Sequence, residues 1–282
     1  MFFIKGIFMG AADVIPGVSG GTVAFITGIY FRLINSISSV DYSFITLFLK
    51  GKFKDSFKVF KKIDFSLFIP LGLGILLSIF FLSKLMNYLL NNYSSLTFAF
   101  FFGLILGSSI LLLKYVGKIN YEKIIMFSFG FVFAYVLAGV SSMGINNSLL
   151  MIFFAGALAI CAMILPGISG AFILLLLNQY HYLVSALHNY DLVVVGTFGL
   201  GAITGLISFS KLLNYLVKHF QKLLIAFLIG LMVGSLRVPY LKIVNNLGSI
   251  WLVFGFVLIG LFIVVILKYF FDYNSSLDNN KI

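Results

Sequence analysis

A Pro-Gly-x-Ser-Gly sequence occurs twice in this chain, each time inside a long apolar run. The first copy spans residues 16–20 and the second spans residues 166–170. Proline removes a backbone donor, glycine permits a positive φ and serine competes for backbone hydrogen bonds, so each copy must interrupt a helix. Interrupted backbone at membrane depth occurs only where it is buried in protein or lines a cavity. Paired interruptions in two halves of a chain indicate a transport site, so we expect the function where the two breaks meet.

The composition places this chain in a membrane. Of its 282 residues, 61% are hydrophobic and 10% are charged, whereas soluble domains carry about 25% charged residues. We therefore predict an all-α polytopic membrane protein with a single membrane domain, residues 1–282. The net charge of +11 indicates oriented loops and contact with anionic membrane lipids rather than nucleic acid.

The sequence contains no recognisable catalytic motif. The three histidines, at positions 181, 188 and 219, lack metal-ligand spacing. We find no zincin or Walker motif and no credible serine-histidine-aspartate set. We predict no enzymatic activity, no metal and no cofactor.

The apolar segments follow one another in two similar series. The first comprises a broken segment at 1–37, a basic stretch at 41–64 and apolar segments near 66–90, 96–116 and 122–140; the second comprises a broken segment at 149–187, apolar segments near 192–217, 222–236 and 250–271, and a polar tail at 272–282. The basic stretch alternates lysine with phenylalanine, which is typical of an amphipathic helix on the cytoplasmic membrane surface. A solvated basic loop is the alternative.

Sequence identities between the two series define a repeat. Pro16 and Ser19 recur 150 residues later, and residues 83–89 recur at an offset of 127 as residues 210–216. The difference between the offsets matches the length of the basic stretch, which only the first series has. We therefore predict repeat one at 1–140, with the basic insertion at about 41–64, and repeat two at 149–271.

The lysines predict how these repeats lie in the membrane. If the basic stretch is cytoplasmic, and each repeat is a re-entrant hairpin plus three transmembrane helices, each repeat crosses the membrane an odd number of times. The two repeats then have inverted topology, which suits alternating access. Continuous full-length helices in place of the hairpins are the competing topology.

The limb after each break is a short helix whose N-terminus points into the protein. Its free N–H groups and the positive end of its dipole attract an anion, and the glycines let a ligand approach the backbone. The candidate anion-binding residues are Gly17, Ser19, Gly20, Gly21, Thr22, Gly167, Ser169 and Gly170. Close helix packing by small residues is the alternative.

Four charged residues are further candidates. Lys84 and Lys211 are repeat-equivalent, and they either face an anion from opposite sides or extend to the interface. Arg32 either guards the cytoplasmic mouth of the site or follows the positive-inside rule. Asp13, which Met163 replaces in the second hairpin, binds a coupling proton or sodium ion, pairs with a cation, or is simply solvated.

The sequence Ala12-Asp13-Val14-Ile15-Pro16-Gly17-Val18-Ser19-Gly20-Gly21-Thr22, followed by Gly28-Ile29-Tyr30-Phe31-Arg32-Leu33-Ile34, resembles one bacterial membrane family, as does Leu165-Pro166-Gly167-Ile168-Ser169-Gly170. This is the polyprenyl-phosphate translocase family. The resemblance implies a transporter in the bacterial cytoplasmic membrane that returns undecaprenyl phosphate from the outer to the inner leaflet. That step recycles the lipid carrier for cell-envelope polymers.

The two lines of reasoning combine into one hypothesis. The phosphate lies between the hairpin tips, held by the backbone glycines with Ser19 and Ser169, while Arg32, Lys84 and Lys211 compensate its charge. The prenyl tail stays in the lipid. The alternative is a secondary transporter of a small soluble anion, because the residues alone indicate only an anion. The sequence predicts no oligomeric state.

Overall fold

The computed structural model describes residues 1–13, 19–40, 43–139, 148–246 and 248–279. Its helices in the first half are α1 (Phe2–Asp13), α2 (Gly20–Ile26), α3 (Tyr30–Ser38), α4 (Ser43–Leu49), α5 (Phe53–Phe60), α6 (Phe65–Asn92), α7 (Ser94–Val116) and α8 (Tyr121–Leu137). Those in the second half are α9 (Leu149–Ile164), α10 (Gly170–Leu176), α11 (Tyr180–His188), α12 (Leu192–Ser235), α13 (Arg237–Asn245) and α14 (Ile250–Asn279). No strand occurs in these described ranges, so the predicted all-α class is confirmed.

Several of these helices are long and apolar enough to cross a membrane. Four segments meet this criterion in the described part of the chain, within α6, α7, α12–α13 and α14. The pair α10–α11 counts as a fifth if it is a single broken span, since it bends by 107°. The chain is therefore a multi-pass membrane protein, as its composition predicts.

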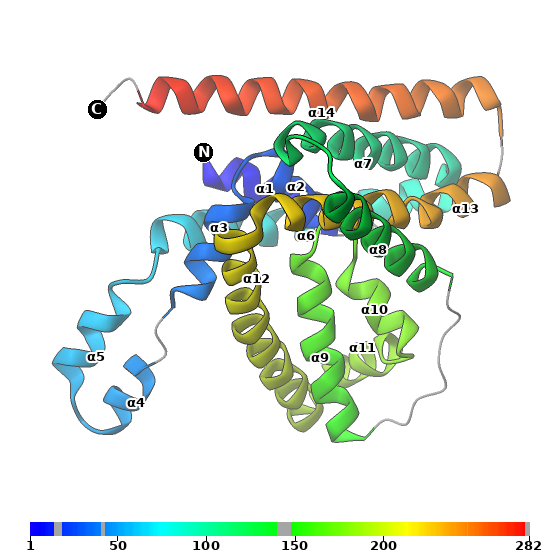
Figure 1. The fold of residues 1–282 in the computed structure, drawn as a ribbon. Coiled ribbons are helices and arrows are strands. Elements are labelled where there is room, and N and C mark those ends of the chain that lie inside the picture. Colours follow the sequence, from blue (N-terminus) through cyan, green and yellow to red (C-terminus); the bar gives the residue numbers. More distant parts are fainter. Residues whose placement is uncertain (14–18, 41–42, 140–147, 247, 280–282) are drawn as a thin grey trace.

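Three element boundaries differ from the sequence-based expectation. The basic stretch forms two short helices rather than one, because Gly51 turns the chain at a φ of +73° between α4 and α5. Figure 1 shows this pair extending away from the other helices. The predicted segments at 192–217 and 222–236 are the two arms of α12, which is bent at Phe220. The predicted polar tail is helical as far as Asn279.

Matching elements recur at the offsets that the sequence indicates. Helices α2 and α10 begin and end 150 residues apart, and so do α3 and α11. The break at Tyr93 (φ −134°, ψ 40°) matches the bend at Phe220 (φ −133°, ψ 35°), 127 residues later. Asp64 caps the start of α6 and Asp191, also 127 residues later, caps the start of α12. Helix ends, breaks and N-caps therefore occur at equivalent positions in the two halves.

Long helices of each half pack against helices of the other half. Helix α7 of the first half packs against α14 of the second, and α8 packs against α12. The glycines that permit these close approaches also correspond, since Gly103 faces the Val257 backbone and Gly230 faces that of Phe127. Figure 1 shows α14 lying alongside α7. The two halves are thus interlocked rather than side by side.

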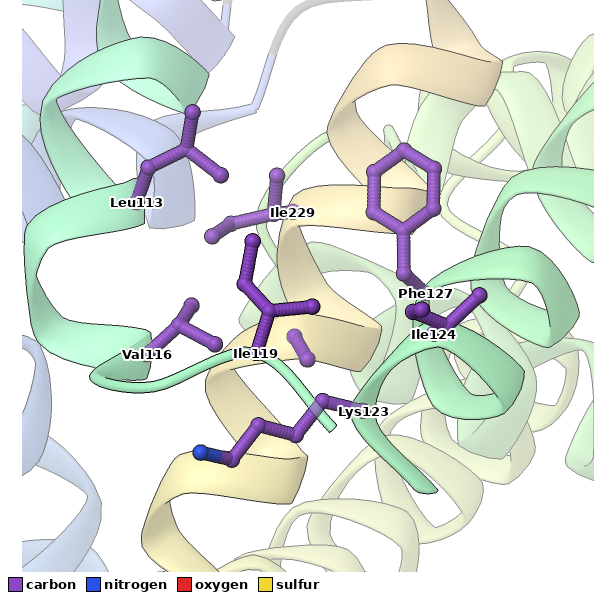
Figure 2. A pocket seen from close by; sticks show the side chains of 8 residues that line it. Leu113, Val116, Ile119, Lys123, Ile124, Phe127 and Ile229 are labelled. Carbon is purple, nitrogen blue, oxygen red and sulfur yellow. The ribbon is translucent and has the colours of Figure 1, made fainter. Parts of the chain in front are cut away.

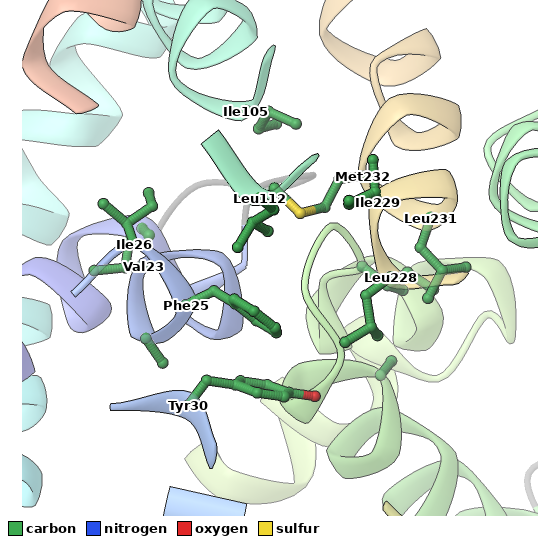
Figure 3. Packing of buried hydrophobic residues seen from close by; sticks show 14 of the residues in the cluster. Val23, Phe25, Ile26, Tyr30, Ile105, Leu112, Leu228, Ile229, Leu231 and Met232 are labelled. Atoms are coloured by element: carbon green, nitrogen blue, oxygen red, sulfur yellow. The ribbon is translucent and has the colours of Figure 1, made fainter. Parts of the chain in front are cut away.

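The first hairpin lies in the centre of this arrangement. Val23, Phe25 and Tyr30 of α2 and α3 are buried in one cluster with residues of α7 and α12, such as Ile105 and Leu228. Figure 3 shows these side chains converging between the helices. The rings of Phe25 and Tyr30 stack with their centroids 4.4 Å apart. This core holds the start of α2 against the second hairpin.

Candidate functional site

The two interrupted segments contact each other directly. The Ser19 hydroxyl donates a hydrogen bond to the Leu165 carbonyl at 3.0 Å, and the Gly167 N–H donates one to the Thr22 hydroxyl at 3.0 Å. Ser19 and Thr22 are buried, with exposed fractions of 1% and 0%. The structure therefore brings the two breaks together, but these two hydroxyls already serve contacts between the hairpins.

Gly21 and Gly167 make this contact possible. A Cβ at Gly21 would lie 2.8 Å from the Ile164 carbonyl oxygen. Gly167 has a φ of +87°, and a Cβ there would lie 2.8 Å from the Cα of Met232 in α12. Gly167 thus requires glycine for both conformation and space. Gly17, which was also predicted for the site, lies outside the described residues.

The start of α2 is occupied by oxygen atoms of the protein itself. Ser19 is its N-cap residue, and its hydroxyl accepts a hydrogen bond from the Gly21 N–H at 3.1 Å. The Asp13 carboxylate accepts one from the Gly20 N–H at 2.7 Å. Since Asp13 is itself an anion at a helix N-terminus, the place predicted for a ligand at the first hairpin holds this carboxylate.

The start of α10 is different. Ser169 is the N-cap residue with extended backbone, yet its side chain makes no capping hydrogen bond to the described residues. Met163 stands at the position of Asp13 and brings no carboxylate. The sequence asymmetry between the hairpins thus leaves only the second one without a side-chain cap.

A cavity of about 240 Å³ lies at the start of α10. Two of its lining residues are Asp13 from the first hairpin and Ser169 from the second. The rest are small or apolar: Gly156, Ala159, Ile160, Met163, Gly170, Ala171, Leu174, Phe198 and Ala202. A carboxylate and a hydroxyl from different hairpins therefore face one mostly apolar space.

Comparison with known proteins decides the family. A family model described as undecaprenyl phosphate translocase-like matches residues 9–248. The chain belongs to this family. A protein of Vibrio cholerae serotype O1, named polyprenyl-phosphate transporter, is 39% identical over 234 residues, which are 83% of this chain and 75% of the relative. A protein of the same name from Staphylococcus aureus is 33% identical over 279 residues, covering 93% of each chain. No solved structure matches the chain.

These findings confirm the predicted family. The translocase-like family and both relatives are named for translocation and transport, not for an enzymatic reaction.

Arg32 lies at an ion pair outside the cavity. Its guanidinium contacts the Asp64 carboxylate at 3.1 Å and lies 4.7 Å from the centroid of the Phe2 ring. The hydroxyl of Ser66 and then the guanidinium of Arg32 hold the pKa of Asp64 below its usual value. Arg32 thus fixes α3 to the start of α6, and it does not line the cavity.

Lys84 and Lys211 do not line the cavity either. Both have exposed side chains, on α6 and α12 respectively. This placement matches the alternative in which the lysines extend to the membrane interface. It gives them no direct contribution to the start of α10.

Lys5 is a charged residue that the sequence analysis missed. It is 8% exposed, and its ammonium donates to the Thr27 carbonyl at 2.7 Å, at the C-terminal end of α2. Helix α2 therefore has a carboxylate at its start and an ammonium at its end, both favourable to its dipole. The available signal was that Lys5 is the only cation before Arg32 in an apolar segment, with Ala155 at the equivalent position.

Proposed function

We propose that this protein carries undecaprenyl phosphate from the outer to the inner leaflet of the bacterial cytoplasmic membrane. The transport would recycle the lipid carrier for cell-envelope polymers. One observation carries the proposal: two interrupted hairpins are joined by the Ser19–Leu165 and Gly167–Thr22 hydrogen bonds beside a cavity. The names of the two relatives support a polyprenyl phosphate as the lipid, and the description of the family supports undecaprenyl phosphate.

The phosphate binds at the start of α10 in this proposal. There the first N–H groups of the helix, with the Ser169 hydroxyl, form an environment that favours an anion. The start of α2 is not available in the same way, because Asp13 and Ser19 accept hydrogen bonds there. The prenyl tail remains in the lipid phase. Because the tail is a hydrocarbon, it does not need to be enclosed by the protein.

Asp13 is the coupling residue in this proposal. A carboxylate and a phosphate in one small cavity of low polarity repel each other strongly. Binding of a proton or a sodium ion at Asp13 removes this repulsion. The ion and the lipid then occupy the cavity together, which couples lipid movement to an ion gradient.

The exchange of leaflets proceeds by alternating access between two inverted repeats. Support comes from the matched elements at offsets of 150 and 127 residues and from the lysines of the 41–64 stretch, which favour a cytoplasmic location for it. Exposed Phe48, Phe53 and Phe57 among these lysines suit the surface of an anionic membrane. Repeat two then starts from the opposite side.

Leaflet exchange in proteoliposomes tests the proposal. Undecaprenyl phosphate in the outer leaflet is quantified with a membrane-impermeant reagent, for wild type and for Ser169→Ala. We expect wild type to accelerate exchange. Exchange by Ser169→Ala should be at least about tenfold slower than by wild type, because the variant loses one charge-assisted hydrogen bond to the phosphate. The matched control is Ser185→Ala, which removes an exposed hydroxyl on α11 of the same half.

Two results would contradict the proposal. If folded wild type leaves exchange unchanged with and without proton and sodium gradients, the protein does not move this lipid, and uptake of small soluble anions becomes the next assay. If Ser169→Ala and Ser185→Ala both match wild type, the phosphate does not bind at the start of α10.

A further inference from the structure

A second cavity of about 240 Å³ lies between α7, α8 and α12. Ile229 of α12 forms its floor, and Leu113 of α7 and Phe127 of α8 form its walls (Figure 2). Ala226 of α12 also lines it. Among the described residues of its lining, Lys123 at the start of α8 is the only charged one. None of the lining residues belongs to either hairpin, so this cavity is separate from the candidate transport site.

The equivalent place in the other half is filled. The two places are related by offsets of 127 residues between α7 and α12 and of 130 between α8 and α14, because Gly130 of α8 faces the Phe227 carbonyl and Gly260 of α14 faces that of Phe100. Phe102 stands where the cavity has Ile229, and Val253 stands where it has Lys123. Phe102 and Val253 pack on the buried cluster of Phe98, Ala99 and Ile243.

This comparison shows what opens the cavity. Replacing phenylalanine by isoleucine removes volume from the floor, and replacing valine by lysine brings a charge to the wall. These two side-chain differences therefore distinguish the cavity from its equivalent in the other half. Because exposed Leu113 and Ile124 belong to its lining, the cavity opens on the outer surface of these helices, where a lipid can occupy it.

The lining indicates what the occupant is. Apolar cavities of about 150 Å³ stay dry and bind hydrocarbon, so a larger apolar cavity beside lipid suits a hydrocarbon chain. Leu113 and Ile124 at its rim are exposed on the outer surface of the helices. A chain of a membrane lipid can therefore enter from the side.

The charges around the cavity indicate the head group. The Lys123 ammonium donates to the Lys118 carbonyl, in the loop that covers one end of the cavity. The Lys222 ammonium lies 3.7 Å from where a Cβ of Gly117 would be, in the same loop. Glu122, the acid next to Lys123, is exposed and engaged by the Asn120 amide at 3.4 Å. Basic pockets between membrane helices bind anionic lipid head groups.

We propose that this cavity binds one anionic glycerophospholipid, with an acyl chain between α7 and α8 and its phosphate against Lys123 and Lys222. The occupant is a resident lipid and not the transported one for two reasons. A route that uses both repeats would have matching grooves, whereas at the equivalent place Phe102 and Val253 pack on a buried apolar cluster. Ile229 is also 2% exposed and belongs to the core that holds the first hairpin, so it separates the cavity from that hairpin (Figure 3).

Native mass spectrometry of the full chain tests this site. Purified protein is titrated with phosphatidylglycerol or with phosphatidylcholine of the same acyl chains. We expect one phosphatidylglycerol to be retained at least tenfold more tightly than phosphatidylcholine. Lys123→Val, which installs the residue of the other half, should abolish this preference. Lys118→Val removes a lysine of the same loop that does not line the cavity, and it should retain the preference.

A second variant tests the apolar part of the cavity. Ile229→Phe installs the bulk of Phe102 and should lower retention of both lipids at least fivefold. Because overpacking can unfold a protein, Ile124→Trp at the exposed rim provides an independent obstruction. Phosphatidylglycerol should raise the Tm of wild type by several degrees and leave that of the obstructed, folded variant unchanged.

Three outcomes would overturn the proposal. Equal retention of the two lipids by wild type would exclude a head-group site. Unchanged retention in both obstructed variants would exclude the cavity. Displacement of phosphatidylglycerol by equimolar undecaprenyl phosphate, with slowed leaflet exchange in Ile124→Trp, would assign the cavity to the transported lipid.

Discussion

The Ser19 hydroxyl donates to the Leu165 carbonyl of the second hairpin and accepts from the Gly21 N–H of its own. Ser169, its repeat equivalent, makes no capping hydrogen bond to the described residues. The two serines at matched positions therefore have different roles: Ser19 joins the hairpins and Ser169 lines a cavity. This difference can be tested with the same substitution at both positions.

Ser19→Ala should lower stability by about 1–2 kcal/mol, because it removes a helix cap and a buried hydrogen bond. Ser169→Ala should lower stability by less than about 0.5 kcal/mol, while reducing transport. Thermal unfolding in detergent measures the first effect, and leaflet exchange measures the second. Equal loss of stability in both variants would contradict the different roles.

Asp13→Asn should uncouple transport from the ion gradient. The amide oxygen of asparagine can still accept the hydrogen bond from the Gly20 N–H, but the side chain no longer binds a proton or sodium ion. We expect exchange by this variant to be unchanged when a proton or sodium gradient is imposed, whereas that of wild type changes with one of them. A variant that responds as wild type does would remove Asp13 from the coupling.

Asp13→Ala provides the structural control for this experiment. It leaves the buried Gly20 N–H without its acceptor, which should cost about 1–3 kcal/mol of stability. Circular dichroism melts of the two variants should therefore separate the loss of charge from the loss of the hydrogen bond.

Gly167→Asn should destabilise the protein by at least about 2 kcal/mol. Asparagine tolerates positive φ better than other residues, but a Cβ at this position meets the α12 backbone at Met232. The matched control is Gly28→Asn, at a φ of +72° with open space around it and with Asn178 at its repeat position. The control should change stability by less than about 1 kcal/mol, and a comparable loss at both positions would refute the packing argument.

Asp64→Asn should lower stability slightly at pH 7 and have progressively less effect in acid. The folded-state pKa of Asp64 lies below its ordinary value, so its ionised form is favoured on folding. This contribution is present above the unfolded pKa, about 3.9, and is lost as the pH falls through the folded pKa. Since the pair with Arg32 is solvent-exposed, it contributes less than about 1 kcal/mol.

Urea unfolding of both proteins between pH 3 and pH 7 measures this dependence. The difference between wild type and Asp64→Asn should shrink as the pH falls below about 4. A difference that grows with acidity would mean that the pKa of Asp64 is raised in the folded state.

The sequence was sufficient to predict the helical membrane class and the two places where helices break. Proline, glycine and serine act locally, so Ser19 and Ser169 mark the starts of α2 and α10 without knowledge of the fold. The 127-residue offset would also have paired Asp64 with Asp191 as helix caps. In each of these cases the residue types and their spacing were enough to predict a helix break or a helix cap.

Contacts between distant residues were not readable in this way. That Asp13 reaches Gly20 depends on how α1 packs against α2. That Arg32 meets Asp64, instead of a ligand, depends on the position of α3 beside α6. The sequence gives no partner for Lys5, because its ammonium reaches the Thr27 carbonyl only through the packing of α1 against α2. Such pairings depend on tertiary structure, which one sequence does not specify residue by residue.

The exchange of helices between the halves restricts how this protein can move. Because α7 packs on α14 and α8 on α12, with glycines that allow backbone contact at both places, the two halves cannot rock apart as rigid bodies without breaking both seams. These long-helix contacts therefore resist movement between the halves, and the freedom to rearrange lies with the short hairpin helices. A cross-link across either seam should therefore leave transport intact, whereas one between the hairpin tips should arrest it.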